Sequence, residues 1–523
     1  MPSGPARFNA ADDPWIDVRT ATTYRQVGLR DLFLDAHTID DLALPSPPAA
    51  SALLRILVAI TARITDLDDA DLGAAQWHTH RRQLLTCGRG FTAQRVHAYF
   101  DTHCFEVFDP VRPWLQDPAL PEQCTTTAGI NTLIFGRPAG NNLAWLCPHT
   151  HTDHDATPVP TAEALQHLLI HHYYGRSGGC SARTVAGTSH PRGTSGPLRS
   201  TVSFHPLGRT LHETLLAGIP PFLDDEQTLQ DQCPWEETPP PDPLRPPHPV
   251  TWPGRLLTGR SRHAVLLIPG DDGTTVTDTY LTWATQHRKL ETTDPYLIVH
   301  TDPKKPIERR RTVRRADADR AWWRDLDALL LAPDENRATR RPQVFDTLND
   351  LPATIRRTLR VRVHGFDQDT KVNNRQWYTA ITPPVLNWAQ ENDPQRAERI
   401  AQCCQAAEQI AVRLTFLADR AWKQTTTPNS ASLAPDRPQR RTRGAWMSRA
   451  RAVYWEHAER VFWRLLDEPD TPAYTAFADT AATALRQATD SDRVRHRAAA
   501  RAVALAVAAL YRRAPRPSAR QEA

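Results

Sequence analysis

The C-terminal part of the chain limits the possible folds more than any other feature. Beyond Gln376 the sequence consists of helical patterns separated by Pro-, Thr- and Arg-rich linkers. The main ones are AERIAQCCQAAEQIAVRLTFLADRAW, WMSRARAVYWEHAERVFWRLLD, TPAYTAFADTAATALRQAT and VRHRAAARAVALAVAALYRR. Their apolar residues recur at a spacing of three and four, which gathers them on one face of each helix. Four such helices predict an antiparallel four-helix bundle over residues 376–523.

The preceding residues, 1–375, mix helical and strand patterns, and a chain of 523 residues exceeds one ordinary core. The run SALLRILVAITARIT (residues 51–65) is apolar nearly all round and predicts a buried helix, and residues 28–44 have helical spacing. TLRVRVHGF (residues 358–366) alternates with a period of two and predicts a strand. The expected fold class is therefore α+β, with a mixed N-terminal α/β domain and a C-terminal four-helix bundle.

The charge and cysteine content restrict the class of protein. A formal charge of +4 is too small for a polycation, so any affinity for nucleic acid must come from local patches. The eight cysteines form no CxxC pair, and we find no signal peptide or long apolar run. We therefore expect reduced thiols, a cytoplasmic location and no membrane association.

The stretch from Tyr173 to Pro220 combines glycine with arginine. Five glycines and a Gly196-Pro197 pair interrupt the helical pattern, and five arginines lie between them, at positions 176, 183, 192, 199 and 209. Glycine lets a backbone approach a ligand closely, and arginine presents forked donors to phosphates and base edges. A loop of this length is usually functional or disordered. The pattern predicts a nucleic-acid-binding loop, and the alternative is a flexible surface excursion.

Three shorter segments add to this pattern. AGINTLIFGRPAGNNLAWLC (Ala128 to Cys147) predicts a strand, a loop and a strand, with Arg137 placed to meet a phosphate. DPKKPIERRRTVRR (Asp302 to Arg315) is the most basic run, which is either a phosphate-contacting segment or a solvated charged loop. The polar turn GFDQDTK (Gly365 to Lys371) either enters a duplex or simply closes a strand.

One motif indicates catalysis. His149, His151, Asp153 and His154 match the HxHxDH pattern of metallo-beta-lactamase-type hydrolases, in which one loop holds two zinc ions. That fold needs glycine-rich strands upstream, whereas the upstream patterns here are helical. The chain contains no P-loop, Rossmann glycine signature or nucleophile elbow. A binuclear zinc hydrolase is the alternative function.

Taken in order, the segments resemble one family, the CasA large subunits of the type I-E CRISPR surveillance complex, Cascade. The resemblance rests on FNAADDPWIDV, GLRDLFLDAHTI followed by ALLRILVAI, NTLIFGRPAGNN, the glycine stretch ending GPLRSTV, LHETLLAGI, AWWRDLDALL and the polar tip after VHGF. Each motif is modest, but their order and spacing match the family along nearly the entire chain.

The resemblance implies a subunit without catalytic activity or cofactor. It would recognise the protospacer-adjacent motif in double-stranded DNA, largely through the minor groove, and help open the duplex for guide-RNA pairing. The implied partners are the other Cascade subunits, the CRISPR guide RNA, the target DNA and a recruited helicase-nuclease. A free-standing nonspecific DNA-binding protein is a third possibility.

The resemblance also assigns residues. It implies DNA contacts from the glycine loop, a lysine finger at Lys304 or Lys305, and a wedge at Gln368 or Asp369; the glycine-loop residues are Gly175, Arg176, Gly178 and Gly179. The segment that engages the guide RNA contains Asn131, Ile134, Phe135 and Arg137. Some relatives carry paired CxxC motifs for a structural zinc, which this chain lacks; a single zinc at Cys147, His149 and His151 would be a remnant. We therefore expect no metal site.

Overall fold

The computed structural model describes residues 6–69, 71–137, 156–221, 230–237, 241–287, 293–332, 337–369, 373–426 and 444–512. The chain divides into two compact units, the first formed by Met1–Arg320 with Ala332–Asn387 and the second by Ala321–Leu331 with Trp388–Ala523. This division differs from the expected boundary between residues 375 and 376. Strand β14 (Asn374–Ile381) spans that boundary and pairs with β13 (Arg360–Gln368), which keeps it in the first unit.

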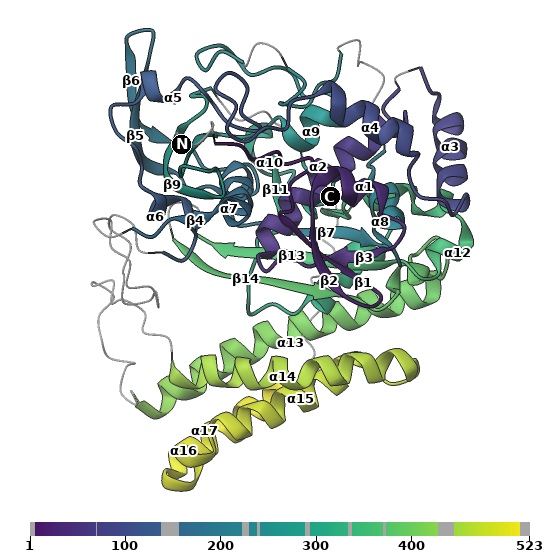
Figure 1. Cartoon of the computed structure of the whole chain (residues 1–523). Helices are drawn as coiled ribbons and strands as arrows, with labels where there is room; N and C mark the ends of the chain where they lie inside the picture. The colour runs from purple at the N-terminus through teal and green to yellow at the C-terminus, as the bar shows by residue number, and fades with distance from the viewer. Residues whose placement is uncertain are drawn as a thin grey trace. The chain divides into compact units, whose positions relative to one another are not determined.

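Helix α2 (Pro47–Ile64) forms the centre of the first unit (Figure 1). Its residues are buried almost without exception, which confirms the predicted buried helix. Among the described helices it is the one long and apolar enough to cross a membrane, but 89% of that stretch is buried inside the unit, as in the core helix of a folded domain. It packs against α7 (Thr161–Tyr174), α8 (Leu211–Gly218), α9 (Gly254–Thr258) and β13.

Small antiparallel sheets surround this helix. The sheet that bears on function has the order β14-β13-β7, with β7 at Val202–Leu207. Val361 and Val363 of β13 are buried and Arg360 and Arg362 are partly exposed, as the period-two pattern predicts, whereas every residue from Val363 to Gln368 is buried. The remaining strands are β1 (Ile16–Thr20), β2 (Tyr24–Val27), β3 (Ile39–Leu42), β4 (Val159–Pro160), β5 (Gly178–Val185), β6 (Thr188–Gly193), β8 (His263–Pro269), β9 (Thr275–Trp283), β10 (Val299–Thr301), β11 (Arg311–Val313) and β12 (Thr339–Arg340).

Shorter helices complete the first unit. They are α1 (Leu29–Leu34), α3 (Ala74–Thr86), α4 (Ala93–Thr102), α5 (Leu120–Gln123), α6 (Ile130–Leu133), α10 (Ile307–Arg310), α12 (Ala353–Arg356) and the 3-10 helix η3 (Gln343–Asp350). A second 3-10 helix, η4 (Val385–Trp388), lies at the point where the chain enters the second unit.

Three local predictions were wrong. Residues 28–44 are not one helix, because α1 ends at Leu34 and β3 pairs with β1 after a turn. The stretch from Tyr173 to Pro220 is not one long loop: β5 and β6 form a hairpin through Ala186 and Gly187, both at positive φ, and β7 follows. Helix α8 at its end confirms the helical pattern of residues 207–219. The first strand expected in Ala128–Cys147 is instead the short helix α6, and residues 138–147 lie outside the described residues.

The second unit is built from long helices, as the sequence predicts. These are α13 (Pro394–Thr426), α14 (Ala445–Asp467), α15 (Ala473–Ala488) and α17 (Arg497–Leu510), with the short α16 (Asp490–Arg495) before α17. The 3-10 helix η2 (Trp322–Asp325) and α11 (Leu326–Leu330) join them.

Two hydrogen bonds show how helices α13 and α14 run relative to each other. Arg399, near the start of α13, donates to the carbonyl oxygen of Leu465, near the end of α14, while the hydroxyl of Tyr454 in mid-α14 donates to the carbonyl oxygen of Ala407. Helices α13 and α14 are therefore antiparallel. Trp323 of η2 stacks on Phe462 of α14 with ring centroids 4.6 Å apart, so the inserted segment is part of this unit's core.

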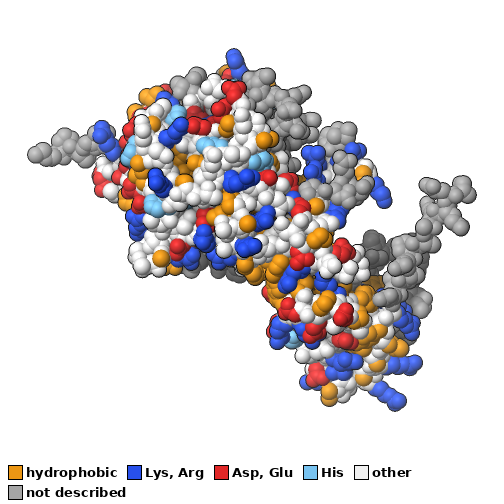
Figure 2. Space-filling view, turned by 90° about the vertical axis from the view of Figure 1, so that its right-hand side faces the viewer, with side chains coloured by type: hydrophobic (Ala, Val, Ile, Leu, Met, Phe, Trp, Pro, Cys, Tyr) orange, Lys and Arg blue, Asp and Glu red, His pale blue; other side chains and the backbone are white. Residues whose placement is uncertain are grey.

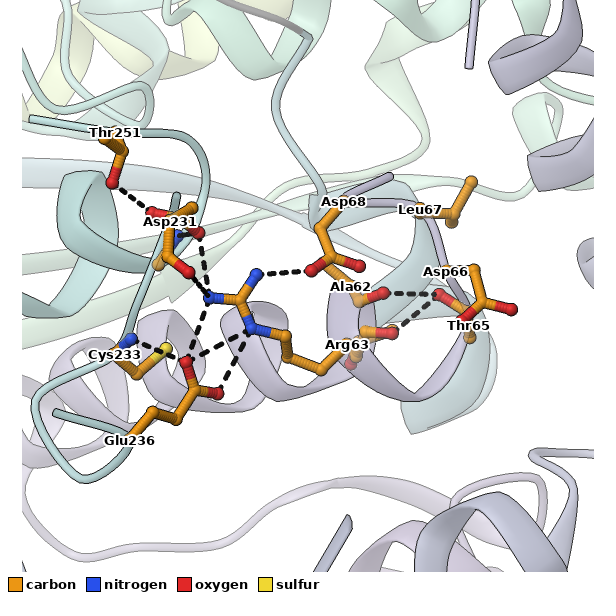
Figure 3. A network of polar contacts seen from close by, with 12 residues as sticks. Ala62, Arg63, Thr65, Asp66, Leu67, Asp68, Asp231, Cys233, Glu236 and Thr251 are labelled. Atoms are coloured by element: carbon orange, nitrogen blue, oxygen red, sulfur yellow. Dashed lines mark hydrogen bonds and ion pairs between the residues drawn. The ribbon is translucent and has the colours of Figure 1, made fainter. Parts of the chain in front are cut away.

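A polar network at the end of α2 fixes a long connection of the first unit (Figure 3). The guanidinium of Arg63 donates to the carboxylates of Asp68, Asp231 and Glu236. Asp231 also accepts the backbone N–H of Gly254 at 2.7 Å, and Glu236 accepts the hydroxyl of Tyr99 at 2.8 Å. One arginine thus holds residues 231–236 and the start of α9 against the core helix.

Candidate nucleic-acid interface

The glycine segment, residues Gly175–Gly179, begins where α7 ends. Gly175 is buried, and a Cβ there would meet the carbonyl oxygen of His171 and the Cε1 of His263, each at 2.5 Å, so no larger residue fits. Gly179 is exposed with open space beside it, and Arg176 is exposed. Gly178 takes a φ of 118°, which side-chain-bearing residues rarely adopt. The segment therefore offers an exposed backbone and one exposed cation next to a tightly packed anchor.

The arginines of this region divide into structural and exposed groups. Arg183 is buried and donates to Gln123, to Asp117 and to the carbonyl oxygen of Trp283. Arg209 pairs with Glu213. Arg183 therefore holds the fold together and has no surface for a nucleic acid, whereas Arg209 forms a pair at the surface. Arg176, Arg192 and Arg209 are the exposed members.

The turn between β13 and β14 lies beside the glycine segment. Gln368, at the end of β13, is 3% exposed; its Nε2 donates to the carbonyl oxygen of Tyr174 and to Oδ1 of Asn374, and its Oε1 accepts the N–H of Ser200. Asp369 is half-buried, and its carboxylate accepts the backbone and side-chain N–H groups of Asn373. Gln368 thus faces inward, while Asp369 begins the turn.

The buried side chain of Arg199 is hydrogen-bonded to residues of both regions. Its guanidinium donates to the carbonyl oxygens of Tyr174 at 3.1 Å, Asp369 at 3.0 Å and Asn373 at 3.1 Å. Tyr174 is the last residue of α7 and directly precedes the glycine segment. One guanidinium therefore links the residue before the glycine segment to both described ends of the β13–β14 turn, nearly 200 residues away in sequence.

The predicted guide-RNA segment also attaches to α7. Phe135 packs against His171 with ring centroids 4.7 Å apart and against Phe366 of β13 at 5.9 Å. Asn131 and Ile134 are buried, and Phe135 is half-buried. Of the four residues, Phe135 and Arg137 have surface available for a partner, and Arg137 donates to the carbonyl oxygen of Thr157.

The histidines around α7 supply no positive charge. Burial lowers the pKa of His263 to about 4 and lowers that of His171 well below its usual value. Each ring therefore stays neutral near pH 7, with Nε2 beside a carbonyl oxygen, that of Arg176 for His263 and that of Leu133 for His171. Burial also lowers the pKa of Arg199 to about 10, so its guanidinium remains charged. Within the glycine segment, the exposed cation is Arg176.

The basic segment, Asp302 to Arg315, is connected to the same part of the fold. Lys304 and Lys305 are exposed between β10 and α10, and Lys305 makes a loose ion pair with Asp302 at 3.7 Å. Strand β10 pairs with β11, and beyond β11 the N–H of Ala316 donates to the carbonyl oxygen of Ser200. Ser200 is also bonded to Gln368. On the face shown in Figure 2, lysines and arginines lie in several separate groups among neutral side chains, as the small net charge predicts.

The catalytic-looking motif, His149 to His154, lies outside the described residues, as does Cys147. Within the described ranges, no group of three His, Cys, Asp or Glu side chains is arranged to hold a metal ion. The region before the motif forms helices α2, α3 and α4, as the sequence predicts. The sequence pattern does not separate Arg199 from the other four arginines of its stretch and does not single out His263, because no local pattern distinguishes a buried side chain from an exposed one.

The chain is similar to known proteins along nearly its whole length. The profile of the family described as CRISPR-associated protein Cse1 matches residues 9–494. A CasA/Cse1 protein of Thermus thermophilus is 26% identical over 429 residues, which are 80% of this chain and 78% of that protein. A chain of a CRISPR RNA-guided surveillance complex is 36% identical with a TM-score of 0.86, covering 97% of this chain and 100% of the other. The solved structure of Thermus thermophilus CasA shares the fold, with a TM-score of 0.68 at 20% identity over 96% of this chain and 99% of that one.

Proposed function

Since the chain belongs to the family of CRISPR-associated Cse1 proteins, we propose that it is the large subunit of a type I-E surveillance complex that recognises the protospacer-adjacent motif in double-stranded DNA. In this role it helps open the duplex beside the motif so that the guide RNA can pair with one strand. Protein reads the short motif, and base pairing reads the rest.

The observation that carries this proposal is the meeting of two predicted DNA-contacting segments at the end of α7. The glycine segment presents exposed backbone at Gly179 and a cation at Arg176, which suits close approach to a groove and its phosphates. Asp369, where the turn begins, is bonded to the same guanidinium, that of Arg199, as Tyr174 before the glycine segment. Reading of the motif and separation of the next base pair therefore take place side by side.

The exposed lysines supply a third contact. Lys304 or Lys305 reaches the motif or its phosphates, and each phosphate contact adds to the salt dependence of binding. The family resemblance assigns the wedge to Gln368 and Asp369; the inward bonds of Gln368 favour the turn at Asp369 as the part that touches the duplex.

The remaining partners follow from membership of a surveillance complex. Phe135 and Arg137 contact the 5′ end of the guide RNA, with Ile134 and Asn131 supporting them from inside the unit. The other Cascade subunits hold the chain in place, and a recruited helicase-nuclease docks on it. The chain contributes recognition rather than catalysis, and the complex works in the cytoplasm.

The test is binding of duplex DNA by the reconstituted guide-RNA complex with and without this chain, across a randomised short motif beside a matched target. High-affinity binding that appears only with the chain, and only beside certain motifs, is the expected result. Equal binding beside every motif, or no effect of the chain, would overturn the proposal.

Two variants assign the contacts within that assay. Gly179→Ala places a methyl group in open space, so the fold is unaffected while approach to DNA is hindered, and motif-dependent binding weakens. The double change Lys304→Ala with Lys305→Ala weakens binding and reduces its salt slope by about 1 for each phosphate that the lysines no longer neutralise. An unchanged slope and affinity in the lysine variant would remove both lysines from the interface.

A further inference from the structure

The buried guanidinium of Arg199 is bonded to both candidate DNA-contacting segments but has almost no surface of its own. Its side chain is 2% exposed. Its Nη1 donates to the carbonyl oxygen of Tyr174, its Nε to that of Asp369 and its Nη2 to that of Asn373. Because the turn begins at Asp369 and returns at Asn373, one side chain holds both of its ends and the end of α7.

Ser200 and Gln368 form a second connection beside the first. The hydroxyl of Ser200 donates to the carbonyl oxygen of Gln368 at 2.6 Å, and the N–H of Ser200 donates to Oε1 of the same residue at 3.1 Å. The Nε2 of Gln368 then donates to Tyr174, the same carbonyl oxygen that Arg199 uses. The β13–β14 turn is thus bonded twice to the residue before the glycine segment.

We propose that Arg199 is a positioning residue that couples motif reading at the glycine segment to base-pair separation at the β13–β14 turn. This inference rests on the proposed function and adds a role to it. Arg199 does not touch the nucleic acid, since it is enclosed by the two segments it joins. It fixes Asp369 and Asn373, the described ends of the turn, relative to the glycine segment, so that a duplex seated on the glycine segment meets Asp369 at its first base pair.

The chemistry of the contact requires arginine. Three carbonyl oxygens lie around one planar fork with several N–H donors in fixed directions. A lysine has the same charge but a single compact ammonium group, which cannot reach all three oxygens in this arrangement. Arg199→Lys therefore keeps the charge and loosens the link between the segments.

The experiment compares Arg199→Lys with wild type in the reconstituted complex on two targets beside the same motif. One target is a full duplex, and the other has its first base pairs mismatched so that it is already open. Fluorescence of 2-aminopurine at the first target position reports base-pair separation. The control is Arg209→Lys, because Arg209 is 60% exposed and pairs with Glu213 away from both segments.

We expect Arg199→Lys to bind the pre-opened target within about twofold of wild type while opening of the duplex slows by about tenfold or more, the factor produced by losing one hydrogen bond to a charged group. Arg209→Lys should match wild type on both targets. Equal losses on both targets would show that Arg199 only supports the fold, and no loss on either would show that it couples nothing. Both results would overturn the inference.

A milder variant keeps the test decisive if Arg199→Lys unfolds the unit. Ser200→Ala removes only the hydroxyl that bonds Gln368, and it should slow opening in the same direction by a smaller factor. Unchanged opening in a folded Ser200→Ala protein would count against the coupling. The wild-type arm separates this inference from the proposed function: if wild type shows no motif dependence, the function fails, whereas normal wild-type behaviour with uncoupled variants rejects only the role of Arg199.

Discussion

Replacing Arg63 by methionine is the sharpest test of how the first unit is held together. Arg63 neutralises three carboxylates at the end of α2, those of Asp68, Asp231 and Glu236 (Figure 3). Arg63→Met keeps much of the side-chain volume but leaves these three like charges together with little contact with water. Removing one partner of a buried ion pair typically costs about 3–5 kcal/mol. Since Arg63 is 13% exposed, which lets some water in, we expect a loss near the lower end, about 3 kcal/mol at pH 7.

The pH dependence of this loss has a defined sign. Burial already raises the pKa of Asp68, with Asp231 adding to the effect, even though Arg63 is present. Without Arg63 the pKa of Asp68 rises further above its unfolded value, so protonation stabilises the folded variant at low pH, and that stability is lost as pH rises through the folded pKa. The difference in the free energy of unfolding between wild type and Arg63→Met should therefore be largest at pH 7 and become smaller toward pH 4.

The assay is urea-induced unfolding at pH 7 and pH 5, combined with hydrogen exchange of residues 230–237. Arg95→Met is the matched control, because Arg95 forms an exposed pair with Asp66 in the same region and such pairs contribute less than about 1 kcal/mol. Arg63→Met should also speed exchange at residues 230–237 first. If Arg63→Met is no less stable than Arg95→Met at pH 7, or if the gap widens as the pH falls, the reasoning is wrong.

Three further predictions concern the histidines, a glycine and the bundle. Burial, with Arg55 or Arg362 nearby, holds the pKa of His205 and that of His364 well below the usual value. The unfolded chain therefore takes up more protons than the folded chain as the pH drops below about 6.5. Urea titrations should show the free energy of unfolding falling by up to about 1.4 kcal/mol per pH unit for each ring. Gly175→Ala should lower the melting temperature and weaken DNA binding together, because its methyl group overlaps a carbonyl oxygen and an imidazole; a variant of wild-type stability would contradict this. Tyr454→Phe should destabilise the second unit by about 1 kcal/mol in calorimetry, since a buried hydrogen bond at 2.9 Å is lost, and an unchanged transition would refute this.

Periodic segments were predictable because one physical cause dominates them. Helix α2 is apolar nearly all round and is buried, and β13 alternates between partly exposed and buried residues over Arg360–Val363. The C-terminal helices bury their apolar faces. The hairpin of β5 and β6 escaped prediction because its strands contain glycine and polar residues, and only its pairing makes them strands. The local sequence does not indicate that these two segments pair.

The candidate site could be predicted only in part. The family resemblance pointed to the glycine segment and to the turn at Gln368, and the order of motifs is what made this possible. No local pattern indicates that Gln368 turns inward or that Arg199 lies beneath both segments, because each depends on partners about 170 residues away. A charge pattern shows where arginines lie in the sequence but does not show which of them are buried.

The insertion of Ala321–Leu331 into the second unit has a consequence for synthesis on the ribosome. Trp323 leaves the exit tunnel well before Phe462, the ring on which it stacks, has been translated. Until α14 emerges, this tryptophan and the leucines of α11 have no permanent apolar surroundings and depend on chaperones or transient burial. A fragment that starts at Trp388 would lack them entirely, so an expression boundary placed just before the long helices should yield a protein with a hole in its core and poor solubility.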